Sequence, residues 1–235
     1  FFAWSPDSKR LAYATEGADT TSSIYLKRID GSGAARKIYT SPVAGTLDIG
    51  NWPAEGNVLC FDQNTRDASW DVLVYSFEDS SAERFWSTPA FDGEPDLSPN
   101  GRWLAYTSNE SGNHEVYVRP YPKSYGVWKI SNGGGTQPVW SPDGEKIYYQ
   151  YHDTMYEVEV TATETFSKGN PGKLFEGSYF LSRGRRWDVH PNGDRFAMIQ
   201  RLESVQKTTE DQNVFVIQNF DEELKRLAPG ERINR

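Results

Sequence analysis

The chain has 235 residues, of which 37% are apolar and 14% aromatic, enough to form a sizeable core. It carries 33 acidic and 25 basic residues, and this net charge of -8 disfavours binding to the phosphates of nucleic acids. No apolar run is long enough to cross a bilayer, so we expect no membrane insertion by this segment. The only cysteine, Cys60, excludes an internal disulfide and is expected to be buried.

Five similar stretches follow one another along the chain, each built around a turn. The position of the turn proline holds Pro6, Ala54, Pro99, Pro142 and Pro191, spaced 43 to 49 residues apart. Such a period, combined with many short strands, is typical of β-propeller blades. Two residues later the chain has Ser8, Gly56, Gly101, Gly144 and Gly193. We expect these residues to adopt the left-handed conformation that lets a hairpin resume its pairing.

The strand after each turn has a fixed apolar pattern. Five residues beyond the turn proline come Leu11, Leu59, Leu104, Ile147 and Phe196. Seven residues beyond it come Tyr13, Phe61, Tyr106, Tyr149 and Met198. Because side chains alternate along a strand, both sets point to the same face. The residue between them is mostly small, as expected where a neighbouring blade packs closely against the opposite face.

Further strands complete each unit. Third strands are predicted at 23–29, 71–77, 115–121, 154–160 and 213–219, and fourth strands at 35–41, 83–88, 127–132 and 172–177. The sequence therefore predicts an all-β chain, a β-propeller of four-stranded antiparallel blades. We place the propeller at 1–219, with blade units at about 1–46, 47–92, 93–135, 136–183 and 184–219. Residues 220–235 are expected to form a C-terminal helix and tail.

The ends of the repeat are incomplete. The fifth unit has no fourth strand, and the chain starts with the first strand FFAW, without Met. We interpret the five units as an arc of a larger propeller with six to eight blades. The open edges would then be covered by upstream blades or by a second chain. The alternative is a five-bladed ring with a three-stranded last blade.

The WSPDG turns, each followed by a strand of the LAY type, resemble the TolB-like, WD-repeat-like propeller family across nearly the whole chain. Residues 91–144, with LFEGSYF and FDEELKRLAP, resemble the C-terminal propeller of bacterial eukaryotic-like serine/threonine protein kinases. This resemblance implies a sensor or protein-interaction domain, often on the extracytoplasmic side of a membrane from the kinase. Similar propellers also follow winged-helix domains in bacterial regulators. The chain has no Gly-rich kinase loop, HRD or DFG motif, so any kinase residues lie elsewhere.

No catalytic or metal-binding motif is present. The three histidines, His114, His152 and His190, have no second His or Cys at a metal-ligand spacing, so we expect loop and turn roles for them. There is no G-x-S-x-G nucleophile elbow and no H-E-x-x-H motif. We therefore expect a chain that is not an enzyme and that holds no metal or cofactor.

Binding is expected on the face that carries the longer loops, since loops on a rigid scaffold usually bear function. Near the mouth of the central channel, six residues lie just before or within a first strand: Asp48, Glu94, Gln137, Arg185, Arg186 and Trp187. We expect recognition of a protein or small-molecule ligand there. Two alternatives remain: the substrate-gating propeller of a prolyl-oligopeptidase-type peptidase, and a periplasmic TolB-like scaffold.

Overall fold

The computed structural model describes residues 2–17, 21–55, 57–64, 69–123, 125–179 and 184–199. Within these residues all regular secondary structure is β-strand. The third strand expected at 213–219 and the helix expected at 220–235 lie outside the described residues, as does Gly56.

The strands form successive antiparallel sheets, here called the first to fifth blade. The first blade contains β1 (Phe2–Trp4), β2 (Arg10–Glu16), β3 (Thr21–Arg28) and β4 (Arg36–Ala44). The second contains β5 (Leu47–Ile49), β6 (Val58–Asn64), β7 (Trp70–Ser76) and β8 (Ser81–Trp86). The third contains β9 (Asp92–Leu97), β10 (Trp103–Ser108), β11 (Glu115–Pro120) and β12 (Trp128–Lys129).

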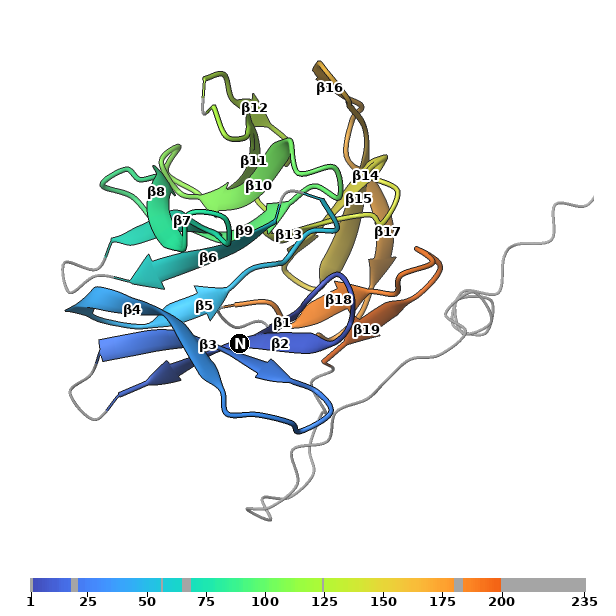
Figure 1. Cartoon of the computed structure of the whole chain (residues 1–235). Helices are drawn as coiled ribbons and strands as arrows, with labels where there is room; N and C mark the ends of the chain where they lie inside the picture. Colours follow the sequence, from blue (N-terminus) through green and yellow to red (C-terminus); the bar gives the residue numbers. More distant parts are fainter. Residues whose placement is uncertain are drawn as a thin grey trace, which may run out of the picture.

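The fourth blade contains β13 (Thr136–Trp140), β14 (Lys146–Tyr151), β15 (Thr154–Ala162), β16 (Phe166–Lys168) and β17 (Gly172–Glu176). The described part of the fifth contains β18 (Trp187–Val189) and β19 (Phe196–Met198). Figure 1 shows the sheets fanned around a common centre, with the first strand of each blade innermost. The prediction of an all-β propeller built from four-stranded antiparallel blades is confirmed.

The turns between first and second strands have the same geometry in four blades. The backbone N–H of Ser8, Gly101, Gly144 or Gly193 donates to the carbonyl three residues earlier over 2.7–2.9 Å. All four residues have positive φ, from 54° at Ser8 to 75° at Gly144. The expected turn role of Pro6, Pro99, Pro142 and Pro191 agrees with this geometry, since each lies directly after the accepting residue.

Replacing Gly144 by valine should lower the free energy of unfolding by about 1–2 kcal/mol, because a β-branched residue is strained at positive φ. The cost should come from the backbone, since an added Cβ would lie 3.7 Å from its nearest neighbour, Pro99 Cδ. Urea denaturation measures the effect. Gly144→Asn is the control and should lose clearly less, because asparagine tolerates this conformation. Equal stability of Gly144→Val and wild type would contradict the turn assignment.

The apolar core is divided into clusters that each join two neighbouring blades. One cluster joins the first and second blades, another the second and third, and two more continue the series to the fifth blade. Each second strand carries two apolar residues, at the positions five and seven residues after the turn position. In blades two to five both of these residues pack against the preceding blade. The small residue between them, such as Cys60 or Ala105, faces the next blade in the second and third blades.

One element was not expected from the sequence. Strand β15 continues beyond its pairing with β17 and forms a hairpin with β16, which projects from the fourth blade (Figure 1). This hairpin contacts the third blade. Asn100 Nδ2 donates to the carbonyl of Ala162 over 2.8 Å, and Trp103 Nε1 donates to that of Thr163 over 3.1 Å. The Phe166 ring lies 5.1 Å from the Trp103 ring, so the hairpin fastens the two blades together.

Candidate functional site

Four of the six residues expected at the channel mouth line one cavity. Asp48, Glu94, Gln137 and Arg185 come from four successive blades and meet where their first strands begin. The cavity has a volume of about 20 Å³, which is room for about one water molecule. A pocket for a small organic ligand usually measures about 300–1,000 Å³. The cavity can therefore receive a single projecting group but cannot enclose a metabolite.

Glu94 lines this cavity and accepts hydrogen bonds from two blades. Its Oε2 accepts the Thr107 hydroxyl over 2.8 Å and the backbone N–H of Gln137 over 2.9 Å. Its own N–H donates to Asp62 Oδ2 over 2.5 Å. Burial raises the pKa of Glu94, and these hydrogen bonds oppose that rise because they favour the carboxylate.

The backbone is strained at two equivalent points of the cavity wall. Glu94 and Gln137 each stand five residues before a turn proline and each have a φ of 54°. Both also precede a proline, a position that normally favours extended backbone. Residues held in the left-handed region against their preference are often found at binding sites. With this backbone conformation, the N–H of Gln137 donates to Glu94 Oε2 in the preceding blade. The side-chain oxygen of Gln137 accepts the N–H of Arg186 over 3.2 Å.

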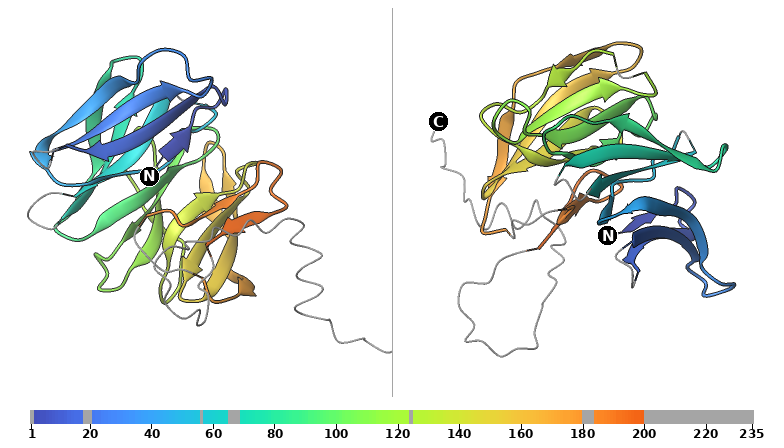
Figure 2. Two further views of the ribbon diagram at one scale, coloured as in Figure 1. Left: turned by 90° about the horizontal axis from the view of Figure 1, so that it is seen from below. Right: turned by 90° about the vertical axis from the view of Figure 1, so that its left-hand side faces the viewer.

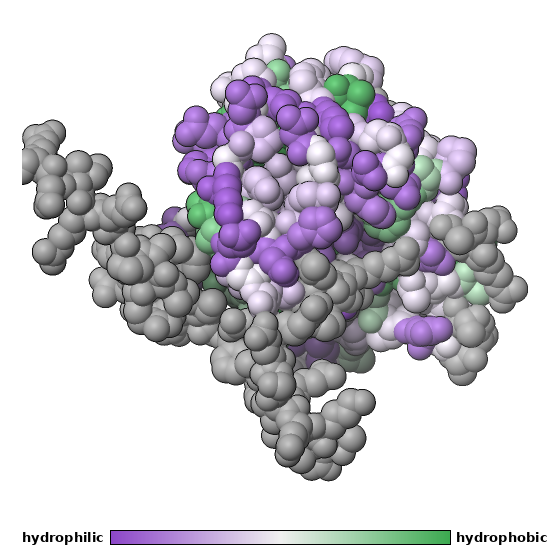
Figure 3. All heavy atoms as spheres, turned by 180° about the vertical axis from the view of Figure 1, so that it is seen from behind, coloured by the Kyte–Doolittle hydropathy of each residue, from purple (hydrophilic) through white to green (hydrophobic). Residues whose placement is uncertain are grey.

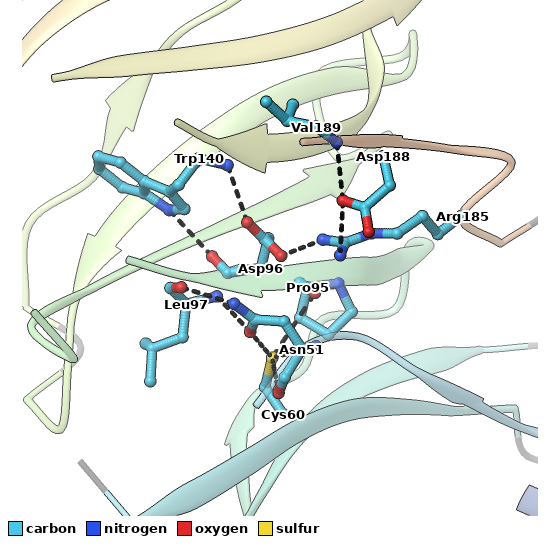
Figure 4. Close-up of polar contacts among 9 residues, drawn as sticks. All are labelled: Asn51, Cys60, Pro95, Asp96, Leu97, Trp140, Arg185, Asp188 and Val189. Atoms are coloured by element: carbon cyan, nitrogen blue, oxygen red, sulfur yellow. Dashed lines mark hydrogen bonds and ion pairs between the residues drawn. The ribbon is translucent and has the colours of Figure 1, made fainter. Parts of the chain in front are cut away.

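Arg185 is fixed by an ion pair that the sequence did not predict. Its guanidinium contacts the buried carboxylate of Asp96 and lies 3.7 Å from Asp188 Oδ1, as Figure 4 shows. Burial raises the pKa of Asp96 to about 6, although the neighbouring Arg185 opposes this rise. Three further carboxylates, those of Asp48, Asp62 and Glu94, also line the cavity.

The side chain three residues before a turn position also links neighbouring blades (Figure 4). Asn51 Oδ1 of the second blade accepts the N–H of Leu97 in the third over 2.8 Å. In the same way, Asp96 Oδ2 of the third blade accepts the N–H of Trp140 in the fourth over 2.8 Å. Cys60 Sγ donates to Asn51 Oδ1 over 2.8 Å, and burial raises the pKa of this thiol to about 12. Cys60 is therefore an unreactive core residue, as expected.

The two remaining candidates lie outside the cavity lining. The backbone of Arg186 borders the site through its bond to Gln137. Trp187 is buried in the cluster between the fourth and fifth blades, 6.1 Å from the Phe196 ring, so it packs the core. Sequence reasoning missed Asp62 and Asp96. Both are buried charged residues within strands. A charge at a position expected to be buried could have identified them from the sequence.

The histidines take loop and turn roles. His114 lies 5.1 Å from the Phe91 ring, His152 lies 4.1 Å from the Tyr151 ring, and His190 Nδ1 accepts the N–H of Asn192 in its turn. Among the described residues no group of three or more His, Cys, Asp or Glu side chains could hold a metal ion. In that same part of the chain no helix is long and apolar enough to span a membrane. The surface opposite the view of Figure 1 is mostly hydrophilic where it is described (Figure 3).

Comparison with known proteins shows the family. The model of the TolB beta propeller domain matches residues 2–179. The chain belongs to the TolB β-propeller family. An uncharacterized protein of Agrobacterium fabrum is 24% identical over 206 residues, covering 83% of this chain and 68% of that protein. TolB from Acinetobacter baumannii has a similar fold, with a TM-score of 0.62 and 18% identity, over 86% of this chain and 48% of TolB.

A peptidase also contains a related segment. The probable dipeptidyl-peptidase 5 of Aspergillus clavatus is 30% identical over 125 residues, covering 44% of this chain but 16% of the peptidase. The matched part of this chain thus spans 48% of Acinetobacter TolB and 16% of this peptidase. The TolB structure supports the propeller fold, and the peptidase shares a segment of similar sequence with this chain.

Proposed function

We propose that this propeller is a non-catalytic recognition domain that binds a protein through the cavity mouth formed by Asp48, Glu94 and Gln137. The observation that carries the proposal is the convergence of side chains from four blades on one small cavity. The strained backbone at Glu94 and Gln137 supports it further. The small volume favours a protein partner that inserts one side chain or terminus over a free small molecule.

The charge at the cavity mouth suggests what that group is. Asp48, Asp62 and Glu94 line it, while the positive charge of Arg185 is paired with Asp96. A lysine ammonium or an α-amino group, each with a single charged nitrogen, complements this arrangement. The partner is then a protein with an exposed basic loop or a basic terminus.

A random peptide library displayed on phage, selected against the immobilised chain, tests this proposal. We expect enrichment of peptides with basic residues. A selected peptide should bind the Asp48→Asn variant at least about tenfold more weakly, the loss expected for a charge-assisted contact. Glu145→Gln is the control, because Glu145 is exposed on a turn at the other end of the blades, and it should bind like wild type. Selection of peptides that are insensitive to Asp48→Asn would contradict the site.

Binding of the selected peptide should also weaken as the pH falls, because protonation removes the negative charge of Glu94. Burial raises the pKa of Glu94, so the loss should begin at a higher pH than for an ordinary glutamate. In a Glu94→Gln variant the affinity should be lower and its decline with pH should be smaller than in wild type, the remainder coming from protonation of Asp96 beside Arg185.

The chain alone should have no hydrolytic activity, because its described residues bring no nucleophile, base and orienting group together. Peptide and ester substrates incubated with the purified chain should be hydrolysed no faster than in buffer. Hydrolysis that a single substitution abolishes would refute this expectation.

We further propose that the parent protein is a bacterial signalling protein, such as a serine/threonine kinase, with this propeller as its extracytoplasmic sensor. The resemblance of residues 91–144 to kinase-linked propellers supports this assignment. The second candidate is the gating propeller of a peptidase, which the similarity to dipeptidyl-peptidase 5 favours. Two assays on the parent protein separate them. Autophosphorylation with labelled ATP supports the kinase, and labelling by a fluorophosphonate supports the serine peptidase.

A further inference from the structure

The cavity at the channel mouth has the size of one small group, and four blades fix that size. Its volume of about 20 Å³ holds about one water molecule. Apolar clusters join the second blade to the third, the third to the fourth and the fourth to the fifth. Figure 2 shows these sheets packed side by side, so that residues of four joined blades form the wall of the cavity.

The cavity does not widen readily, because glycine and proline residues form part of its wall. Gly50 of the second blade lines it and lies against Pro95 of the third. A Cβ added to Gly50 would clash with the Pro95 carbonyl and would lie 2.9 Å from Cys60 Sγ. Pro95 and Pro138 also line the cavity, and their rings fix the backbone φ. The site is therefore preformed, and it selects its occupant by size.

The Glu94 carboxylate has room for about one further hydrogen bond. It accepts the Thr107 hydroxyl and the N–H of Gln137, and the N–H of Gly184 contributes a third hydrogen bond. An ionised carboxylate has about four acceptor positions. Burial raises the pKa of Glu94 most, and charge repulsion from Asp48 adds to that rise. A cation placed near both carboxylates would relieve this repulsion.

A lysine side chain matches the cavity better than an α-amino group does. Its ammonium is compact and stands at the end of an unbranched four-carbon stem. Such a stem packs well along apolar residues, and Ile49, Pro95 and Pro138 line the cavity. An α-amino group is instead attached to a branched Cα with a peptide group beside it. That peptide group would need hydrogen-bond partners next to these apolar residues.

An arginine side chain is excluded by its shape. The guanidinium is a planar group that carries five N–H donors on three nitrogens. A cavity with room for about one water molecule does not hold such a group. The positive charge of Arg185, which itself lines the cavity, is countered by Asp96 and Asp188, which do not line it.

We propose that the cavity is a lysine-specific site, in which one lysine side chain of the partner protein places its ammonium beside Glu94 and Asp48. Neither an arginine side chain nor an α-amino group replaces it. The proposal rests on the proposed function, because it names the group that the cavity mouth recognises. It also implies a means of regulation. Acetylation of that lysine removes its charge and enlarges its end, so the modified partner no longer binds.

A series of synthetic peptides tests the proposal. The parent is a phage-selected peptide that binds Asp48→Asn more weakly than wild type, and each of its basic positions is changed in turn to arginine, norleucine or Nε-acetyl-lysine. Fluorescence anisotropy measures the affinities. At one position the lysine peptide should bind at least about tenfold more tightly than the other three, the effect of one charge-assisted contact.

Protein variants and the peptide terminus supply the controls. In Asp48→Asn the lysine and norleucine peptides should differ clearly less than in wild type. In Glu145→Gln, whose substitution lies on an exposed turn at the other end of the blades, they should differ as in wild type. Acetylation of the peptide N-terminus should leave the affinity unchanged.

The outcomes distinguish the lysine assignment from the function on which it rests. Selected peptides that are all insensitive to Asp48→Asn would refute the binding site itself. A peptide that is sensitive to Asp48→Asn but binds equally well with arginine at every basic position would refute only the lysine specificity. Loss of binding on acetylation of the N-terminus alone would assign the cavity to an α-amino group and would also overturn the lysine assignment.

Discussion

Replacing Phe61 by alanine should lower the free energy of unfolding by about 3–5 kcal/mol, the cost of removing a fully buried ring from a core. The Phe61 side chain has no exposed surface, and its ring lies 5.1 Å from that of Tyr39 in the first blade. The substitution therefore opens a cavity between the first and second blades. Urea denaturation followed by tryptophan fluorescence measures the loss.

The matched control is Tyr13→Ala, because Tyr13 holds the same repeat position in the first blade but is only half-buried. It should cost about 1–2 kcal/mol, in line with its smaller buried area. Equal losses at the two positions would contradict the exposure of the first blade. A negligible loss at Phe61 would contradict the repeat alignment itself.

The second large effect is expected at Asp96, whose removal should cost about 3–5 kcal/mol because the largely buried Arg185 charge keeps only the exposed carboxylate of Asp188, 3.7 Å away, as a partner. Asp96→Ala takes away the carboxylate that contacts the Arg185 guanidinium and the acceptor for the N–H of Trp140. This one substitution therefore removes a contact of the third blade with the fourth and another with the fifth. The same denaturation experiment measures this change.

Two variants separate the ion pair from the general loss of a carboxylate. Asp188→Asn removes a second carboxylate near Arg185, but this one is exposed and 3.7 Å away, so it should cost less than about 1 kcal/mol. The double variant Asp96→Ala/Arg185→Ala should lose less than the sum of its single substitutions, because the buried charge that Asp96 neutralises is gone as well. An additive result would mean that the two side chains act independently.

The fold could be predicted largely because each blade repeats the same local sequence pattern. Proline, aspartate or asparagine, and glycine set the turn, and the alternating apolar residues set the two packing faces. The β15–β16 hairpin could not be recognised in this way. Its single large apolar residue, Phe166, packs against Trp103 and Trp128 of another blade. That contact joins residues far apart in the sequence, and no local pattern encodes it.

The candidate site was predictable only in part, for a similar reason. Asp48, Glu94, Gln137 and Arg185 were found because the first strands of a propeller must line its centre. The roles of Asp62 and Asp96 depend on partners in other blades, the Glu94 N–H in the third and the Arg185 guanidinium in the fifth. Trp187 was predicted at the channel mouth because it begins a first strand. Side chains alternate between the two faces of a strand, and Trp187 points to the face that packs in the core.

The β15–β16 hairpin has a consequence for how the propeller would come apart under mechanical load. At the other blade boundaries apolar packing between the sheets dominates, and such boundaries can open one at a time. At the boundary of the third and fourth blades, the hairpin adds hydrogen bonds from Asn100 and Trp103 and an ion pair between Arg102 and Glu164. These contacts lie away from the central strands and must shear together. A pulling force applied at the two termini would therefore detach the outer blades first and leave this pair as the last folded unit.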